Sequence, residues 1–320
     1  MKETLHEHLS NVLTTHKMTH IDGLLSKYNA KREEIRSALN EKYSSSIYSS
    51  FNSGSYAKHT AINSKFDLDI VVPYKKGSFN TLEEMFNDLY NFLDEKYKDV
   101  AEVRKQKVSI GVLFHEDEDG DVVNIDVVPG REVAADDYLE SKNLNLFFNE
   151  GMGLFAKNSY LKTNIQNQID HIKGKENERK IIRLLKIWKN SNNEKYKSFF
   201  LELATIKAFD KTDVSGNLWD KLRAVMEYIK DNVTKDDFNL KDPGNSNNNV
   251  SDSLDAWDKT LLSSKMEIII KNIEDNNENI KTYFPVNEEF EAEENSDKST
   301  YGLKSTIITP SIPSNNQRFG

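Results

Sequence analysis

The chain has 320 residues, enough for one large domain or for two domains with ordinary cores. Its composition is that of a soluble globular protein, and it has neither a run of about 18 apolar residues nor the apolar stretch of a secretory signal, so we expect a cytoplasmic protein that makes no membrane contact. The absence of cysteine excludes disulfides and thiolate zinc sites. The formal net charge of −9 argues against stable binding of long nucleic acid.

Helices and short strands are expected to alternate in the first half of the chain. The spacing of apolar residues predicts helix over most of residues 2–45. Two strands are expected next, at residues 47–51 and 65–73, followed by an amphipathic helix over residues 81–97. Thr81 is the expected N-cap of that helix, with Glu84 as its capping-box partner.

Two further strands, at residues 107–114 and 122–128, are expected to form a hairpin across an acidic turn that ends in Asp119-Gly120. These signals predict an α+β fold: a core with a mixed, mostly antiparallel sheet, followed by a helical domain. Helices are expected in the second half, at residues 158–173, 176–190, 199–209, 217–231 and 254–275.

The expected organisation is a core with N-terminal helices at residues 1–150, a helical domain at residues 151–285 and a flexible tail at residues 286–320. The tail is rich in Glu, Ser, Thr and Asn and offers few apolar side chains to bury. Such a segment cannot offset the entropy cost of ordering, which is roughly 1–2 kcal/mol per residue.

A small polar turn followed by paired acids is the most informative motif. Gly54 and Ser55 form the turn, and Asp67 and Asp69 follow in an apolar strand. Alternation along a strand places these two acids on one face, where like charges are costly unless a cation lies between them. The turn offers backbone N–H groups and a hydroxyl to a phosphate. This arrangement is typical of metal-dependent nucleotidyl transfer.

A third acid, Asp126, lies in the apolar segment at residues 122–128. If this strand lies beside the one that carries Asp67 and Asp69, three carboxylates converge. Three aspartates can hold two Mg²⁺ ions, with Mn²⁺ as an alternative ion, for in-line displacement at phosphorus. The alternative without a metal site is that the three acids lie on solvated strand faces.

The order of these residues resembles the polymerase-beta-like nucleotidyltransferase superfamily, and more narrowly its bacterial cGAS/DncV-like members. Three later segments support the narrower resemblance. They are the helix at residues 181–189, the Ser-aromatic-x-Leu-Glu-Leu segment within residues 196–203, and the Asp-Pro and Asn-Asn-Val loop at residues 240–250. The resemblance covers roughly residues 47–260.

The resemblance implies roles for individual residues. Gly54 and Ser55 would hold the donor triphosphate, Lys186 and Ser198 would contact phosphates, and Phe199 would stack on a nucleobase. Asp67, Asp69 and Asp126 would be the catalytic acids and metal ligands. An ordinary solvated lysine and a core phenylalanine are the alternatives that the sequence leaves open for Lys186 and Phe199.

The function that the resemblance implies is the condensation of nucleoside triphosphates (ATP, GTP or pyrimidine nucleotides) into a cyclic di- or trinucleotide second messenger in anti-phage (CBASS) signalling. The alternatives are a transferase that acts on tRNA or a protein target, and a silent nucleotide-binding module. Some family members are found with ubiquitin-transfer-like partners that join the synthase's C-terminal residue to a target, and a flexible arm ending in Gly320 suits that chemistry. The alternative is a disordered C-terminus that is not joined to any target.

Overall fold

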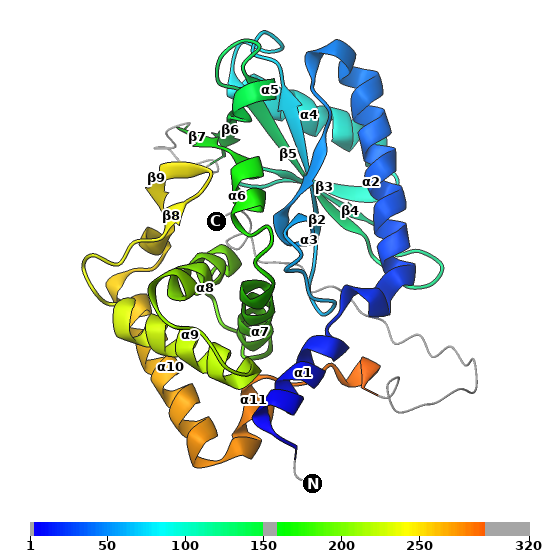
Figure 1. Ribbon diagram of the computed structural model, residues 1–320. Helices are drawn as coiled ribbons and strands as arrows, with labels where there is room; N and C mark the ends of the chain where they lie inside the picture. The colour runs from blue at the N-terminus through cyan, green and yellow to red at the C-terminus, as the bar shows by residue number, and fades with distance from the viewer. Residues whose placement is uncertain (1–2, 150–158, 292–320) are drawn as a thin grey trace.

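The computed structural model describes residues 3–149 and 159–291, and its centre is one seven-stranded sheet (Figure 1). Strands β1, β2, β5, β4 and β3 lie side by side in that order, and β6 continues from β5 to β7. The pair β2 and β5 is parallel, and the other neighbouring pairs are antiparallel. This confirms the mixed, mostly antiparallel sheet. The strands are β1 (Phe51–Ser53), β2 (Leu68–Tyr74), β3 (Ala101–Lys105), β4 (Ile110–Phe114), β5 (Asn124–Glu132), β6 (Leu144–Phe148) and β7 (Ser159–Thr163).

Two long helices, α2 (Asp22–Tyr43) and α4 (Leu82–Tyr97), cover one face of this sheet. The side chains between them and the strands form one buried core, to which Leu68, Ile70 and Val127 belong. The Thr81 side chain caps α4 by accepting a hydrogen bond from the Glu84 backbone N–H at 3.0 Å. The core therefore fixes which strand residues point toward α2 and α4 and which point the other way.

The helical half lies below the sheet in the view of Figure 1, with helices α7–α10 grouped together. Its core includes residues of the N-terminal helix α1 (Leu5–Thr15), such as Leu9 and Val12, so the start of the chain packs with its second half. Among the described residues, no helix is both long and apolar enough to cross a membrane. The remaining elements are α3 (Gly54–Ala57), α5 (Tyr138–Ser141), α6 (Ile165–His171), α7 (Glu176–Ser191), α8 (Ser198–Lys211), α9 (Leu218–Asn232), β8 (Lys241–Asp242), β9 (Asn245–Asn249), α10 (Ala256–Asp275) and α11 (Ile280–Tyr283).

The helix expected at residues 158–173 is wrong in its first part. Ser159–Thr163 is β7, which pairs with the unpredicted strand β6, and the shorter helix α6 follows. The Asn164 side chain caps α6 by accepting a hydrogen bond from the Asn167 backbone N–H at 2.9 Å. Pairing with β6 therefore decides the conformation of β7, and this pairing is not visible in the local pattern.

The last described residues pack against α1 and the turn that follows it. We call residues 284–290 the C-terminal strap. The carbonyl of Phe284 is hydrogen-bonded to Nε2 of His8 at 2.8 Å, and the ring of Phe290 stacks on His20 at 4.9 Å between ring centres. The backbone N–H of Asn287 donates to Oγ1 of Thr15 at 3.0 Å. The packed chain therefore extends beyond the expected boundary at residue 285, and Gly320 lies outside the described residues.

Candidate active site

Two buried carboxylates lie side by side on the parallel strands at the centre of the sheet. Asp69 of β2 and Asp126 of β5 are register partners, and they are 8% and 0% exposed. Partners on neighbouring strands point to the same face of a sheet. Because Ile70 and Val127, the next residues of the two strands, face the core under α2 and α4, the carboxylates point to the opposite face.

Asp67 reaches this region in a different way. The strand expected at residues 65–73 begins at Leu68, so Asp67 lies one residue before β2 and is only partly buried. The sheet register therefore does not fix its side chain. Its charge is felt by Lys186 and Lys189 of α7, which places Asp67 where the sheet meets the helical half.

The Gly-Ser turn lies directly against Asp69. Gly54 begins α3 with a φ of +67°, and a Cβ atom at this residue would lie 1.7 Å from Oδ2 of Asp69. Glycine adopts this backbone conformation without strain and has no side chain to block the approach. The carbonyl of Ser55 accepts a hydrogen bond from the Thr60 N–H at 2.9 Å, which closes the turn. The structure thus brings the predicted phosphate-binding turn and a predicted metal ligand together.

Two buried lysines of α7 approach the same region from the helical half. Nζ of Lys186 donates to the carbonyl of Thr60 at 2.8 Å, and Nζ of Lys189 donates to Oγ of Ser198 at 2.9 Å. Burial lowers the pKa of each lysine to about 8, and the nearby charge of Asp67 opposes this shift in both. Lys186 is only 6% exposed and is therefore not a solvated surface lysine.

Phe199 lies beside a buried ion pair that the sequence analysis did not foresee. Nζ of Lys58, which follows α3, is 2.8 Å from Oε1 of Glu202 on α8 and 4.5 Å from the centre of the Phe199 ring. Phe199 also belongs to the core of the helical half. The pair ties the Gly-Ser turn to α8. The signal in the sequence is a glutamate within the apolar run at residues 199–204, since such a residue needs a cation when it is buried.

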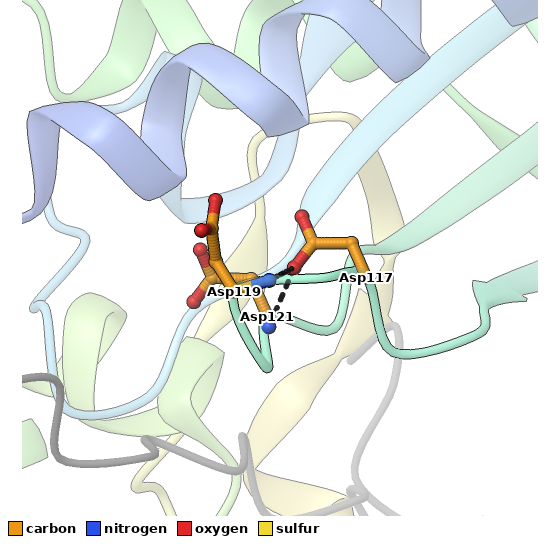
Figure 2. A group of neighbouring side chains, drawn as sticks. All are labelled: Asp117, Asp119 and Asp121. Atoms are coloured by element: carbon orange, nitrogen blue, oxygen red, sulfur yellow. Dashed lines mark hydrogen bonds between the residues drawn. The ribbon is translucent and has the colours of Figure 1, made fainter.

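A separate group of acids occupies the turn between β4 and β5. Figure 2 shows Asp117, Asp119 and Asp121, and the backbone N–H groups of Asp119 and Asp121 donate to Oδ1 of Asp117 at 2.9 and 3.0 Å. Among the described residues, this is the one group of three acids whose ligand atoms all lie within 4.8 Å of one another. Nζ of Lys27 lies 2.6 to 2.7 Å from all three carboxylates. The ammonium group of Lys27 therefore occupies the position between the three carboxylates that a metal ion would otherwise take.

The first part of the chain is similar to one known family of domains. Residues 3–138 match the sequence model of the second messenger oligonucleotide or dinucleotide synthetase domain. This stretch of the chain is therefore similar to that domain. The matched residues include α1, the Gly-Ser turn and all three predicted acids. The lysines of α7 and the Lys58 partner Glu202 lie beyond the matched residues.

The chain is also similar to individual proteins of known structure or activity. The cyclic AMP-AMP-AMP synthase of Escherichia coli (strain MS 115-1) is 27% identical over 191 residues, and the alignment spans 55% of this chain and 55% of that protein. The structure of E. coli MS115-1 CdnC in complex with HORMA-deltaN has a TM-score of 0.66 at 20% identity, covering 87% of this chain and 96% of that one. Vibrio cholerae DncV cyclic AMP-GMP synthase has a TM-score of 0.59 at 13% identity, covering 73% and 68%. The structural likenesses establish the shared fold of both halves.

Proposed function

We propose that this protein joins nucleoside triphosphates into a cyclic di- or trinucleotide second messenger, releasing pyrophosphate, in bacterial anti-phage signalling. The observation that carries the proposal is the pairing of Asp69 with Asp126, directly against the Gly54 turn. The similar proteins support the reaction class, because one makes cyclic AMP-AMP-AMP and another has been determined with a nonhydrolyzable GTP. Because nucleoside triphosphates are made in the cytoplasm, we expect the protein to act there.

The donor set fits a hard divalent cation. Asp69 and Asp126 offer buried carboxylates on one face of the sheet, and Asp67 offers a third at the start of β2. Mg²⁺ prefers such oxygen ligands, completed by water and substrate phosphates. We propose that these three residues hold Mg²⁺, as two ions, with Mn²⁺ as an alternative. When bound, the metal would stabilise charge on the attacking and leaving oxygens.

The other residues of the site would bind and orient the substrate. Gly54 and Ser55 allow a triphosphate to approach the backbone of the turn, and Lys186 and Ser198 would contact its phosphates. Asp126 would also accept the proton of the attacking hydroxyl, since it is a carboxylate on the face that carries Asp69. Base stacking on Phe199 would require Lys58 to leave part of the ring uncovered, because its ammonium lies over that ring.

The test is to incubate the purified chain with labelled ATP, GTP, CTP and UTP and Mg²⁺ or Mn²⁺, and to analyse phosphatase-resistant products by mass spectrometry. Asp69→Asn preserves the size of the side chain and removes its charge, so it should abolish product. Asp119→Asn is the matched control, because this exposed acid belongs to the Lys27 group and should leave the yield unchanged.

The alternatives give different results in the same experiment. Linear products alone would refute ring closure. Transfer of label to added tRNA or to a protein would favour a transferase with a macromolecular acceptor. Calorimetric binding of nucleotide without turnover would favour a silent binding module. No observation in the structure favours either alternative over cyclic product.

A protein partner is a further part of the proposal. The E. coli MS115-1 protein has been determined in complex with HORMA-deltaN, and we propose that this chain also binds a protein of that kind. Conjugation through Gly320 by a ubiquitin-transfer-like partner stays a prediction. Co-expression with the neighbouring genes would test both, by co-purification of a HORMA protein and by mass spectrometry of any adduct at Gly320.

A further inference from the structure

We propose that Gln106 is a positioning residue that orients the carboxylate of Asp126 for metal binding. This inference rests on the proposed function of Asp126. Gln106 lies in the turn between β3 and β4, and its Nε2 donates to Oδ1 of Asp126 at 3.0 Å. The turn adjoins Asp126 because Gly111 of β4 is the register partner of Asp126 on β5. The side chain of Gln106 therefore contacts Asp126, a fully buried acid of the site, through the protein's own fold and without any bound nucleotide.

The orientation of the Gln106 amide is determined by chemistry. The hydroxyl of Ser109 donates to Oε1 at 2.8 Å, and Ser109 is fully buried. An ionised carboxylate only accepts hydrogen bonds, so it must face the amide NH₂ group, while the hydroxyl can donate to the amide oxygen. The opposite orientation would bring two acceptors together. Ser109 and Asp126 thus hold the amide from its two ends.

The backbone of the turn is held as firmly as the side chain. The N–H of Gln106 donates to the carbonyl of Ser109 at 2.9 Å, and Nδ2 of Asn149 donates to the carbonyl of Gln106 at 3.2 Å. The N–H of Asn149 also donates to the carbonyl of Lys107 at 2.7 Å. The segment after β6 therefore clamps the β3–β4 turn. A donor on so rigid a support restricts the rotation of the Asp126 carboxylate, as partners of metal-ligating carboxylates commonly do.

The removal of this donor should weaken metal binding while the fold survives. Gln106→Met keeps the length of the side chain and removes both polar ends. Loss of such a supporting hydrogen bond typically lowers metal affinity or activity by about 10- to 100-fold. We expect the Mn²⁺ affinity of the nucleotide-free protein, measured by electron paramagnetic resonance, to fall by about this factor. In turnover, kcat should fall and the Mg²⁺ requirement should rise, while KM for nucleotide should change little.

Two further variants separate positioning from a general structural effect. Gln166→Met is the matched control, because Nε2 of Gln166 donates to the exposed acid Asp170 at 3.1 Å in a similar amide–carboxylate pair. It should leave Mn²⁺ affinity unchanged. Ser109→Ala keeps Gln106 but releases Oε1, so it should give a smaller loss of affinity, and it remains available if Gln106→Met does not fold. In an Asp126→Asn background, Gln106→Met should have no further effect on Mn²⁺ binding.

The inference is overturned if Gln106→Met, or Ser109→Ala where the former does not fold, binds Mn²⁺ within twofold of the parent at an unchanged melting temperature. If that result is obtained and the unmutated protein still makes cyclic product, the inference fails but the proposed function stands. A loss of Mn²⁺ affinity in Gln106→Met, in a protein that makes no cyclic product, would support the inference and contradict the proposed reaction. The two failures are therefore distinguishable.

Discussion

A Cβ atom at residue 54 would lie 1.7 Å from Oδ2 of Asp69. We therefore predict that Gly54→Ala abolishes the proposed nucleotide synthesis, because either the turn or the carboxylate must move. The left-handed backbone at this residue adds a cost of roughly 1–2 kcal/mol for any L side chain. Displacement of a reacting group by about 1 Å can lower turnover about 100-fold, and we expect a loss of at least that size.

Gly77→Ala is the matched control for this prediction. Gly77 is exposed, and a Cβ atom there would meet nothing within 4 Å. Its turnover and melting temperature should equal those of the parent. If Gly54→Ala retains the parent's kcat/KM, the close approach between Gly54 and Asp69 has no role in catalysis.

The second prediction concerns pH. Burial lowers the pKa of Lys186 and Lys189 to about 8, against about 10.4 for a free lysine. A lysine loses its positive charge as the pH rises through its pKa, so the attraction for a triphosphate should weaken. We expect kcat/KM, which reports the free enzyme, to fall above a pH of about 8.

Stability should change in the opposite direction over the same range. Between a pH of about 8 and about 10.4, the unfolded chain binds more protons at these lysines than the folded protein does. The free energy of unfolding therefore rises with pH across this window from these two groups. Lys180→Met, at an exposed lysine of the same helix, should leave both profiles unchanged. A kcat/KM that stays flat up to pH 9.5 would contradict the prediction.

The third prediction concerns the ion pair of Lys58 and Glu202. Both side chains are buried, so Glu202→Gln would leave the Lys58 ammonium without its counter-charge. Breaking a buried pair from one side typically costs about 3–5 kcal/mol. We expect the free energy of unfolding, measured by urea denaturation, to fall by about 3–5 kcal/mol. Nucleotide binding should also weaken, because Lys58 follows the Gly-Ser turn.

A double variant distinguishes an unpaired charge from lost packing. Lys58→Met combined with Glu202→Leu removes both charges, and such replacements are often neutral or stabilising. It should therefore be more stable than Glu202→Gln alone. The exposed pair Arg223–Glu227 provides the control, because Glu227→Gln should change stability by less than about 1 kcal/mol. Equal losses in the buried and exposed pairs would refute the argument.

The sequence predicts the fold class and much of the element order because these follow from local signals. The apolar runs around Asp69 and Asp126 indicate buried strands, and an acid in a buried strand needs a physical reason. The Thr81 cap is equally local, and the structure contains its hydrogen bond to the Glu84 backbone. Such features depend on residues that are close together in the chain.

The contacts that the sequence does not predict join distant residues. Lys58 and Glu202 are 144 residues apart, and Gln106 and Asp126 are 20 apart, so no local period brings them together. The strand β7 was expected as helix because its pairing with β6 is decided by the tertiary fold. The late start of β2, which leaves Asp67 outside the strand, also depends on packing around its end.

The C-terminal strap has a consequence for the time course of folding during synthesis. Its hydrogen bonds join residues 276 and 272 positions apart, from His8 to Phe284 and from Thr15 to Asn287. Translation at about 5–20 residues per second separates these partners by on the order of ten to sixty seconds. During that interval α1 has left the ribosome, and its apolar stripe waits for α7 and α9. A chain released before residue 284 can still pack α1 against α7 and α9, but it lacks the two hydrogen bonds by which the strap completes the packing of α1.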